Sequence, residues 1–158
     1  MMNINKILYP TDFSEYSIAA LPYAVGLSEQ NKSEFHCLHV VDVESEEFIR
    51  HGYVIPLVSL PDISESEIMR SAQKQLDEFV SENMAEAQPL VKKVIRGKPF
   101  VEIIRYARDN SIDLIVMGTH GRSALASILL GSVTEKVVRK APCPVLTVRH
   151  PQHKFEMP

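Results

Sequence analysis

The chain has 158 residues, of which 45% are hydrophobic and 23% are charged. This composition is that of an ordinary globular domain, and it excludes disordered, collagen-like and coiled-coil proteins. The formal net charge is −3, and the sequence contains neither a basic stripe nor a run of five like charges, so we expect no nucleic-acid partner and no membrane surface.

The amino-terminal residues and the two cysteines indicate a cytoplasmic location. Residues 1–6 lack the apolar core of a secretory signal. Cys37 and Cys143 form no CxxC motif and no disulfide framework, which is typical of reduced thiols. We therefore expect a cytoplasmic protein.

The first part of the chain predicts two strands that flank one helix. Lys6–Pro10 is a short apolar run ended by proline, which predicts a buried strand. The next apolar pattern is helical but contains Pro22, which indicates that this helix bends or starts late. Phe35–Val43 is nearly continuously apolar and predicts a second strand. Glu44–Ile63 is irregular and apolar, and we expect it to pack on the body of the protein or on a partner.

The remaining sequence continues the same alternation of strands and helices. Ser64-x-x-Glu67 is a capping box and opens a helix. The elements that follow are a strand over Leu90–Ile95, a helix from Pro99, a strand over Asp113–Met117, a helix over Ser132–Lys140 and a strand over Val145–Arg149. Five strands alternating with four helices predict one doubly wound α/β domain over residues 1–149, with a parallel sheet and helices on both faces. Residues 150–158 are polar and predict a frayed tail.

Half of the glycines lie close together in the sequence. The chain has 6 glycines, and Gly118, Gly121 and Gly131 fall within 14 positions, with the spacing G-x2-G-x9-G-S. This spacing is neither a Walker A loop nor a G-x-G-x-x-G fingerprint. Glycines at Gly118 and Gly121 permit positive φ and a close approach of the backbone to a ligand, and the free N–H groups of the following helix attract anions. The segment therefore predicts a phosphate cradle.

Several residues near this segment have both a structural and a functional interpretation. Ser132-x-x-Glu135 is also a capping box, which would explain Ser132 without a ligand. Asp12 either caps a helix or contacts a ribose, a base or water-bound Mg²⁺, and Ser14 is available as the cap. His120 either donates to a phosphate or merely occupies the glycine loop. With the sheet order 3-2-1-4-5, the first and fourth strands would be neighbours, and Asp12 would face the glycine segment.

The remaining reactive side chains predict no catalytic triad and no metal site. His36 and His39 are three residues apart in a strand, so they point to opposite faces and do not share a metal ion. Cys143 lies between two prolines and has no evident base. We therefore predict no catalytic residues and no direct metal ligands.

The chain resembles the universal stress protein family from Lys6 to Arg149. The segments that carry the resemblance are Ile7–Ser14, His39–Val40, Asp113–Gly121, Leu129–Glu135 and Pro142–Leu146. The G-x2-G-x9-G-S/T spacing marks the ATP-binding branch of that family. The resemblance implies an open five-stranded parallel sheet of order 3-2-1-4-5, similar to the Rossmann fold and to the adenine nucleotide alpha-hydrolases.

The resemblance further implies ATP or AMP in the crevice between the first and fourth strands, with Mg²⁺ or Mn²⁺ on the phosphates near Asp12. The implied nucleotide-binding residues are Pro10, Thr11, Asp12, Val40, Met117, Gly118, His120, Gly121, Arg122, Gly131, Ser132, Val133 and Thr134. The resemblance also implies a homodimer that pairs through the strand Val145–Arg149.

Three functions are compatible with these residues. The first is a stress-response protein that binds ATP or AMP and acts by nucleotide-dependent regulation or partner binding. The second is a slow ATPase or nucleotide hydrolase, for which Asp12, His120 and Glu135 are the only local candidate groups. The third is a dimeric interaction protein that binds no nucleotide.

Overall fold

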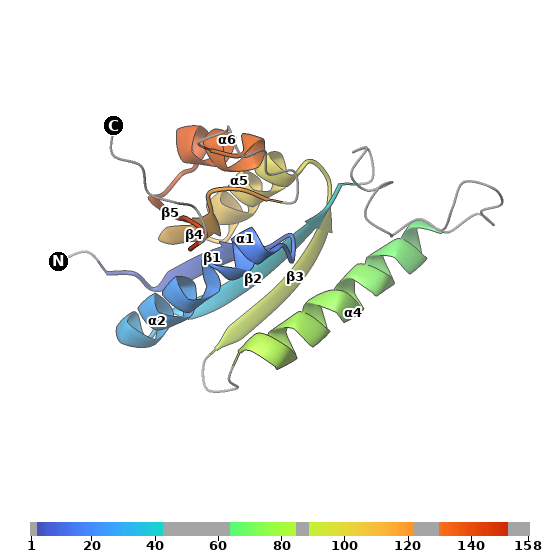
Figure 1. Cartoon of the computed structure of the whole chain (residues 1–158), viewed down its shortest axis with the longest axis horizontal. Helices are drawn as coiled ribbons and strands as arrows, with labels where there is room; N and C mark the ends of the chain where they lie inside the picture. Colours follow the sequence, from blue (N-terminus) through green and yellow to red (C-terminus); the bar gives the residue numbers. More distant parts are fainter. Residues whose placement is uncertain (1–2, 43–63, 85–88, 122–129, 152–158) are drawn as a thin grey trace.

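A five-stranded parallel sheet forms the centre of the molecule, with the strand order β3-β2-β1-β4-β5 (Figure 1). The structure is a computed structural model that describes residues 3–42, 64–84, 89–121 and 130–151. The strands are β1 (Lys6–Pro10), β2 (Glu34–Val41), β3 (Leu90–Arg96), β4 (Leu114–Gly118) and β5 (Val145–Val148). All neighbouring strands pair in parallel, which confirms the predicted fold class and sheet order.

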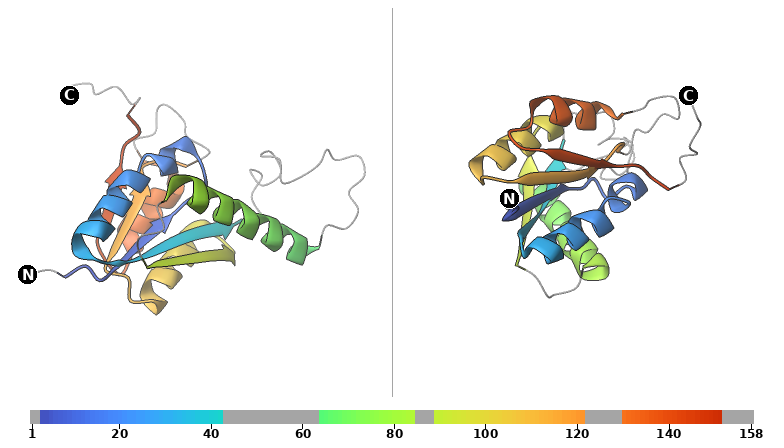
Figure 2. Two further views of the ribbon diagram at one scale, coloured as in Figure 1. Left: turned by 90° about the horizontal axis from the view of Figure 1, so that it is seen from below. Right: turned by 90° about the vertical axis from the view of Figure 1, so that its left-hand side faces the viewer.

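Helices cover both faces of the sheet (Figure 2). They are α1 (Glu15–Ile18), α2 (Leu21–Asn31), α4 (Glu65–Asn83), α5 (Pro99–Asp109) and α6 (Ser132–Lys140). The first three lie on one face, and α5 and α6 lie on the other. The predicted irregular segment Glu44–Ile63 lies outside the described residues.

The first predicted helix is divided in two, as its proline indicated. α1 ends at Ile18 and α2 begins at Leu21, so Pro22 lies in the first turn of α2. A proline there removes an N–H that has no partner within the helix, which is why the break falls immediately before it. The short α1 lies against β4.

The central strands are buried on both faces, because each face is covered by a helical layer. Ile7, Leu8 and Tyr9 of β1 are fully buried. Ile7 and Tyr9 belong to the core beneath α2 and α4, whereas Leu8 belongs to the core beneath α5 and α6. The nearly continuous apolar pattern of these strands in the sequence follows from this double burial.

Helix α4 is fixed at its start by a complete capping box. The Ser64 hydroxyl accepts a hydrogen bond from the Glu67 N–H, and the Glu67 carboxylate accepts one from the Ser64 N–H, which confirms the prediction. Arg96 of β3 forms an ion pair with Glu65 at 2.6 Å. Lys92 of the same strand pairs with Asp77 further along α4.

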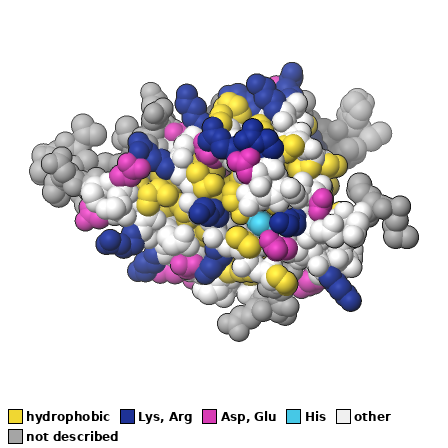
Figure 3. Space-filling view, turned by 180° about the vertical axis from the view of Figure 1, so that it is seen from behind, with side chains coloured by type: hydrophobic (Ala, Val, Ile, Leu, Met, Phe, Trp, Pro, Cys, Tyr) yellow, Lys and Arg dark blue, Asp and Glu magenta, His cyan; other side chains and the backbone are white. Residues whose placement is uncertain are grey.

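The described surface mixes the two signs of charge. Figure 3 shows basic, acidic and hydrophobic side chains interspersed over the face opposite to that of Figure 1. Among the described residues, no helix combines the length and the apolar character needed to cross a bilayer.

Candidate functional site

The loops that follow β1 and β4 meet at the carboxyl edge of the sheet. β1 and β4 are paired neighbours in parallel orientation, so their following loops leave the sheet side by side. A Cβ atom added to Gly121 would lie 2.6 Å from Oδ2 of Asp12. The Asp12 carboxylate therefore lies directly against the glycine segment, as the sheet order 3-2-1-4-5 predicted.

Asp12 is oriented by its own loop and does not cap a helix. Oδ1 of Asp12 accepts hydrogen bonds from the N–H and the hydroxyl of Ser14, at 3.0 Å and 2.6 Å. Ser14 is the N-cap of α1, and its hydroxyl accepts from the Ser17 N–H. The cap is thus Ser14, and Oδ2 of Asp12 is the oxygen on the Gly121 side.

Phe13 carries strain that the sequence did not indicate. Its φ is 63°, in the left-handed region that a bulky residue rarely adopts. Its N–H donates to the Thr11 hydroxyl at 3.0 Å, and its ring lies 4.4 Å from the ring of His39. Strained residues of this kind gather at functional sites. The motif Asp-Phe-Ser was visible in the sequence, but no chemistry attaches to a phenylalanine before its φ is known.

His39 fixes the start of the same loop. Its Nδ1 lies 2.8 Å from the carbonyl oxygen of Thr11. Because a carbonyl oxygen only accepts, Nδ1 carries the proton in this hydrogen bond. The Thr11 hydroxyl also lies 3.0 Å from the hydroxyl of Ser17, so all of these groups shape the loop that holds Asp12.

Two hydrogen bonds tie the start of α6 to the end of β4. The Gly131 N–H donates to the carbonyl oxygen of Thr119 at 2.7 Å. The Thr134 hydroxyl donates to the carbonyl oxygen of Gly118 at 2.9 Å. The segment between these positions, which includes the predicted site residue Arg122, lies largely outside the described residues. The hydroxyl of Thr134 therefore ties α6 to the end of β4, and the N–H of Thr134 belongs to the first turn of α6.

Each glycine of the motif allows another segment to approach closely. A Cβ on Gly118 would lie 2.9 Å from the carbonyl carbon of Tyr16, and one on Gly131 would lie 3.2 Å from Cα of His120. Gly118 and Gly121 do not use the positive φ that glycine permits, since of the described glycines only Gly97 has one. Neighbouring backbone, and not the local conformation, therefore excludes a side chain at Gly118 and leaves a tight fit for one at Gly131.

The first turn of α6 has no side-chain cap. Gly131 is the N-cap and Ser132 is the first helical residue, so the predicted capping box from Ser132 to Glu135 is wrong. The reason is the bond from Gly131 to Thr119, which starts the helix one residue earlier than the pattern suggests. Within the described residues no side chain bonds to the first-turn N–H groups. Such N–H groups, together with the helix dipole, attract anions.

His120 points toward α1. It is buried, its Nδ1 lies 3.1 Å from the Thr119 hydroxyl, and its ring lies 5.9 Å from that of Tyr16. On its other side Tyr16 contacts the ring of His150, the first residue of the predicted tail, at 5.3 Å. The imidazole of His120 therefore helps to pack α1 against the loop after β4.

The other predicted site residues lie at the same edge of the sheet. Pro10 pairs with Leu38 in register, so Val40 extends β2 two residues beyond the end of β1. Val40 packs on the core beneath α5 and α6, and Met117 is buried in it. Apolar residues thus stand at the ends of β1, β2 and β4, whereas Asp12 and the start of α6 supply the polar groups of this edge.

The candidate groups for hydrolysis have other partners. Glu135 forms an exposed ion pair with Arg139 at 3.1 Å. Oδ1 of Asp12 is bonded to Ser14, and the His120 ring is packed on α1. In the parts of the chain that the structure describes, no three His, Cys, Asp or Glu side chains are grouped as metal ligands.

Residues 3–149 match the sequence profile of the Universal stress protein family. This chain belongs to the universal stress protein family. It is 33% identical over 156 residues to the universal stress protein MJ0577 of Methanocaldococcus jannaschii, which covers 91% of this chain and 94% of that protein. The solved structure of MJ0577 matches with a TM-score of 0.75, over 96% of this chain and 99% of that one, at 32% identity.

Two more distant universal stress protein structures share the fold and are described with bound nucleotides. One is a complex with cAMP, with a TM-score of 0.64 and 20% identity over 94% of this chain and 99% of that chain. The other is the Archaeoglobus fulgidus protein in complex with dAMP, with a TM-score of 0.60 and 17% identity over 93% and 98%. At these identities the likeness shows the fold alone.

Proposed function

We propose that this universal stress protein is of the ATP-binding branch, and that it binds ATP or AMP at the carboxyl ends of β1 and β4. In this proposal it is a cytoplasmic stress-response protein that acts by nucleotide-dependent regulation or by binding a partner. Asp12 and Val40 bind the adenine and ribose side, with Pro10 and Thr11 as the wall. The residues that border the ribose and the phosphates are Met117, Gly118, His120, Gly121 and Arg122. The residues that hold the phosphate chain are Gly131, Ser132, Val133 and Thr134.

The observation that carries the proposal is the contact of Asp12 with Gly121 beside the uncapped start of α6. One oxygen of Asp12 is held by Ser14, and the other lies on the Gly121 side. A carboxylate suits the hydroxyl groups of a ribose or the amino group of a base, and free N–H groups at a helix start suit a phosphate. One ligand that presents both kinds of group is a nucleotide.

Two relatives support an adenine nucleotide in particular. The ligands in their structures, cAMP and dAMP, both carry adenine and phosphate. In this proposal Mg²⁺ or Mn²⁺ binds the phosphates near Asp12, because such cations prefer oxygen ligands. Of the three candidate groups for hydrolysis, Glu135 is paired with Arg139 and the His120 ring packs on α1, which supports a binding protein with little or no turnover.

The experiment is calorimetric titration of the unliganded protein with ATP, AMP and cAMP. Asp12→Asn is the informative variant, because the amide oxygen still accepts the Ser14 hydrogen bonds while the charge is lost. We expect this variant to weaken the binding of ATP by about tenfold or more, as for a hydrogen bond to a charged group. Asp109→Asn, on an exposed carboxylate at the opposite edge of the sheet, is the matched control and leaves the affinity unchanged.

Two outcomes would overturn the assignment. Absence of binding by all three nucleotides would remove the proposed function, and equal affinity of wild type and Asp12→Asn would remove Asp12 from the site. Release of ADP in the presence of Mg²⁺ or Mn²⁺ tests turnover separately. A rate no faster than that of buffer is expected.

We further propose that the protein is a homodimer paired through β5. The two edges of the sheet differ: β3 carries Lys92, Lys93 and Arg96, whereas β5 has no charged residue. Lysines on an edge strand oppose pairing with a second chain, and an uncharged edge favours it. Leu146 on β5 is 37% exposed, so an apolar side chain lies at the open edge.

A further inference from the structure

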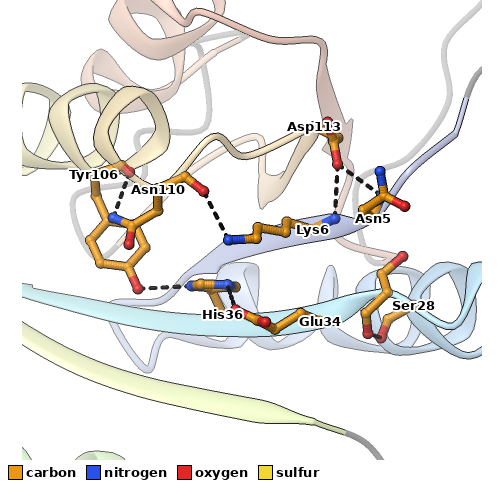
Figure 4. Close-up of polar contacts among 9 residues, drawn as sticks. Asn5, Lys6, Ser28, Glu34, His36, Tyr106, Asn110 and Asp113 are labelled. Atoms are coloured by element: carbon orange, nitrogen blue, oxygen red, sulfur yellow. Dashed lines mark hydrogen bonds and ion pairs between the residues drawn. The ribbon is translucent and has the colours of Figure 1, made fainter.

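A second group of polar side chains lies at the amino edge of the sheet, opposite to the proposed nucleotide site. Figure 4 shows that it joins the starts of β1 and β2 to the last turns of α5. His36 of β2 is at its centre and is only 3% exposed. This group is used by no part of the proposed function.

Both ring nitrogens of His36 have a polar neighbour. Nδ1 lies 2.8 Å from the hydroxyl of Tyr106, which is buried in α5. Nε2 lies 2.6 Å from Oε1 of Glu34, whose side chain is 40% exposed. A buried phenol is thus linked through a buried imidazole to a carboxylate at the surface.

The same turns of α5 are held by β1 and by the turn before β4. The Lys6 ammonium group donates to the carbonyl oxygen of Asn110, the C-cap of α5, at 3.3 Å. Oδ2 of Asp113 accepts the N–H groups of Asn5 and Lys6 at 2.8 Å and 2.9 Å. The end of α5 is therefore attached to the sheet through charged and titratable groups.

These contacts favour one protonation state of His36. With a neutral ring, the Tyr106 hydroxyl donates to Nδ1 and the proton lies on Nε2, which is 2.6 Å from Oε1 of Glu34 without the geometry of a hydrogen bond. With a charged ring, Nδ1 becomes a donor and the Tyr106 hydroxyl must turn around. In the described part of the chain, the acceptor that the Tyr106 hydroxyl contacts is Nδ1 of His36. Protonation of Nδ1 would therefore leave the hydroxyl hydrogen of Tyr106 without that acceptor.

The charged groups around His36 act in opposite directions. Burial disfavours the imidazolium ion and is the largest effect, Glu34 favours it, and Lys6 of β1 disfavours it. On β3 the residue paired with His36 is the apolar Val91. Lys93, two residues further along β3 on the same face of the sheet, is exposed. The sum lowers the pKa of His36 below the value of an ordinary histidine.

We propose that Glu34, His36 and Tyr106 form an acid-sensitive clamp, which holds the end of α5 on the sheet while His36 is neutral and loosens it on acidification. The direction of this pH effect on stability follows from proton binding to His36. In the unfolded chain His36 becomes charged as the pH falls through about 6.5, whereas in the folded protein it becomes charged only at lower pH. Between these two pH values the proton therefore stabilises only the unfolded chain, and the free energy of unfolding falls.

The direct test is titration of the His36 ring by NMR in the full chain, with Glu34→Gln as the variant and Glu29→Gln as the control. We expect a midpoint below about 6.5 in the wild type. Glu34→Gln removes the attraction for the proton and moves the midpoint further down, while Glu29→Gln on the exposed surface of α2 leaves it unchanged. A midpoint at or above about 6.5, or a rise in Glu34→Gln, would overturn the proposal.

The consequence for stability is measured by denaturant unfolding of wild type and His36→Gln from about pH 7 to about pH 5. As the pH falls, the unfolding constant of the wild type should rise relative to that of the variant, by at most about 25-fold because one proton is taken up. Parallel pH profiles would contradict the clamp. Because α5 is the element that is released, acidification should speed up amide hydrogen exchange at Tyr106–Asn110 more than in α4, after correction for the intrinsic effect of pH. Equal changes in the two helices would also contradict the clamp.

Discussion

Gly118 is required by what lies next to it. A Cβ at this position would lie 2.9 Å from the carbonyl carbon of Tyr16, whereas one on Gly26 in α2 would meet nothing within 4 Å. Alanine substitution at these two positions should therefore have opposite effects on stability. This contact also means that a large substitution at Gly118 disturbs α1 before it affects any ligand.

Gly118→Ala should lower the free energy of unfolding by about 1–3 kcal/mol, because the backbone of α1 must move away. Gly26→Ala should raise it by about 0.5–1 kcal/mol, because alanine has the higher helix propensity. Urea denaturation measures both. A neutral effect of Gly118→Ala would contradict the packing of α1 on β4.

The two cysteines should differ in reactivity. Cys37 is fully buried, and this burial raises the pKa of its thiol to about 12, so almost no thiolate forms at neutral pH. Cys143 is only partly buried. Iodoacetamide should modify Cys143 in the folded protein and Cys37 only after unfolding, as read by mass spectrometry. Equal labelling rates in the folded state would contradict the burial of β2.

Alternation in a strand predicted the faces of individual residues but not their partners. His36 and His39 do point to opposite faces, toward Tyr106 of α5 and toward Phe13. The Tyr106 contact joins positions 70 residues apart. Such a contact depends on how α5 crosses the sheet, and the left-handed φ of Phe13 occurs where its ring contacts His39 and Phe79, which are distant in the sequence. Neither leaves a pattern in the local sequence.

At the level of elements, the helix starts show where local patterns suffice. Ser64 and Ser132 both precede a glutamate by three residues, yet only Ser64 is an N-cap. The start of α4 is exposed, so its capping chemistry decides the boundary. The start of α6 is tied to β4 by Gly131 and Thr134, and these tertiary bonds override the pattern.

Ser64→Ala should therefore lower the free energy of unfolding by about 1 kcal/mol, the usual cost of losing an N-cap. Ser71→Ala is the control, because it removes an exposed hydroxyl from the interior of the same helix and leaves the capping box in place. Thermal or urea unfolding compares the two. Equal losses in both variants would show that the capping box contributes nothing specific.

For the whole molecule, the difference between the two sheet edges predicts the oligomeric state. Light scattering should give twice the mass of the 17.8 kDa chain. Leu146→Lys places a charge on the β5 edge and should shift the protein toward the monomer. Tyr23→Lys, at a 58% exposed position on α2, should leave the dimer intact. A monomeric wild type, or a dimer unaffected by Leu146→Lys, would contradict pairing through β5.

The fold as a whole could be predicted because its signals are local and repeated. Each strand is a short apolar run, each connection is long enough for a helix, and right-handed crossovers then fix the layers. The meeting of Asp12 with Gly121 followed from the sheet order. The use of the Thr134 hydroxyl to hold α6 could not be predicted, because the same residue type serves equally well as a helix tie and as a phosphate ligand.

The phosphate site at the start of α6 is tested most directly by the affinity for ATP of Ser132→Pro and Ser132→Ala. Proline fits the first position of a helix. The residue before it, Gly131, has φ −64° and ψ 153°, an extended conformation that a following proline allows. Ser132→Pro therefore removes one N–H and leaves the helix intact. Alanine removes the hydroxyl but keeps the N–H. Calorimetry should show Ser132→Pro binding ATP about tenfold more weakly than Ser132→Ala, with adenosine bound equally by both. Equal affinity of the two variants for ATP would contradict a phosphate at this helix.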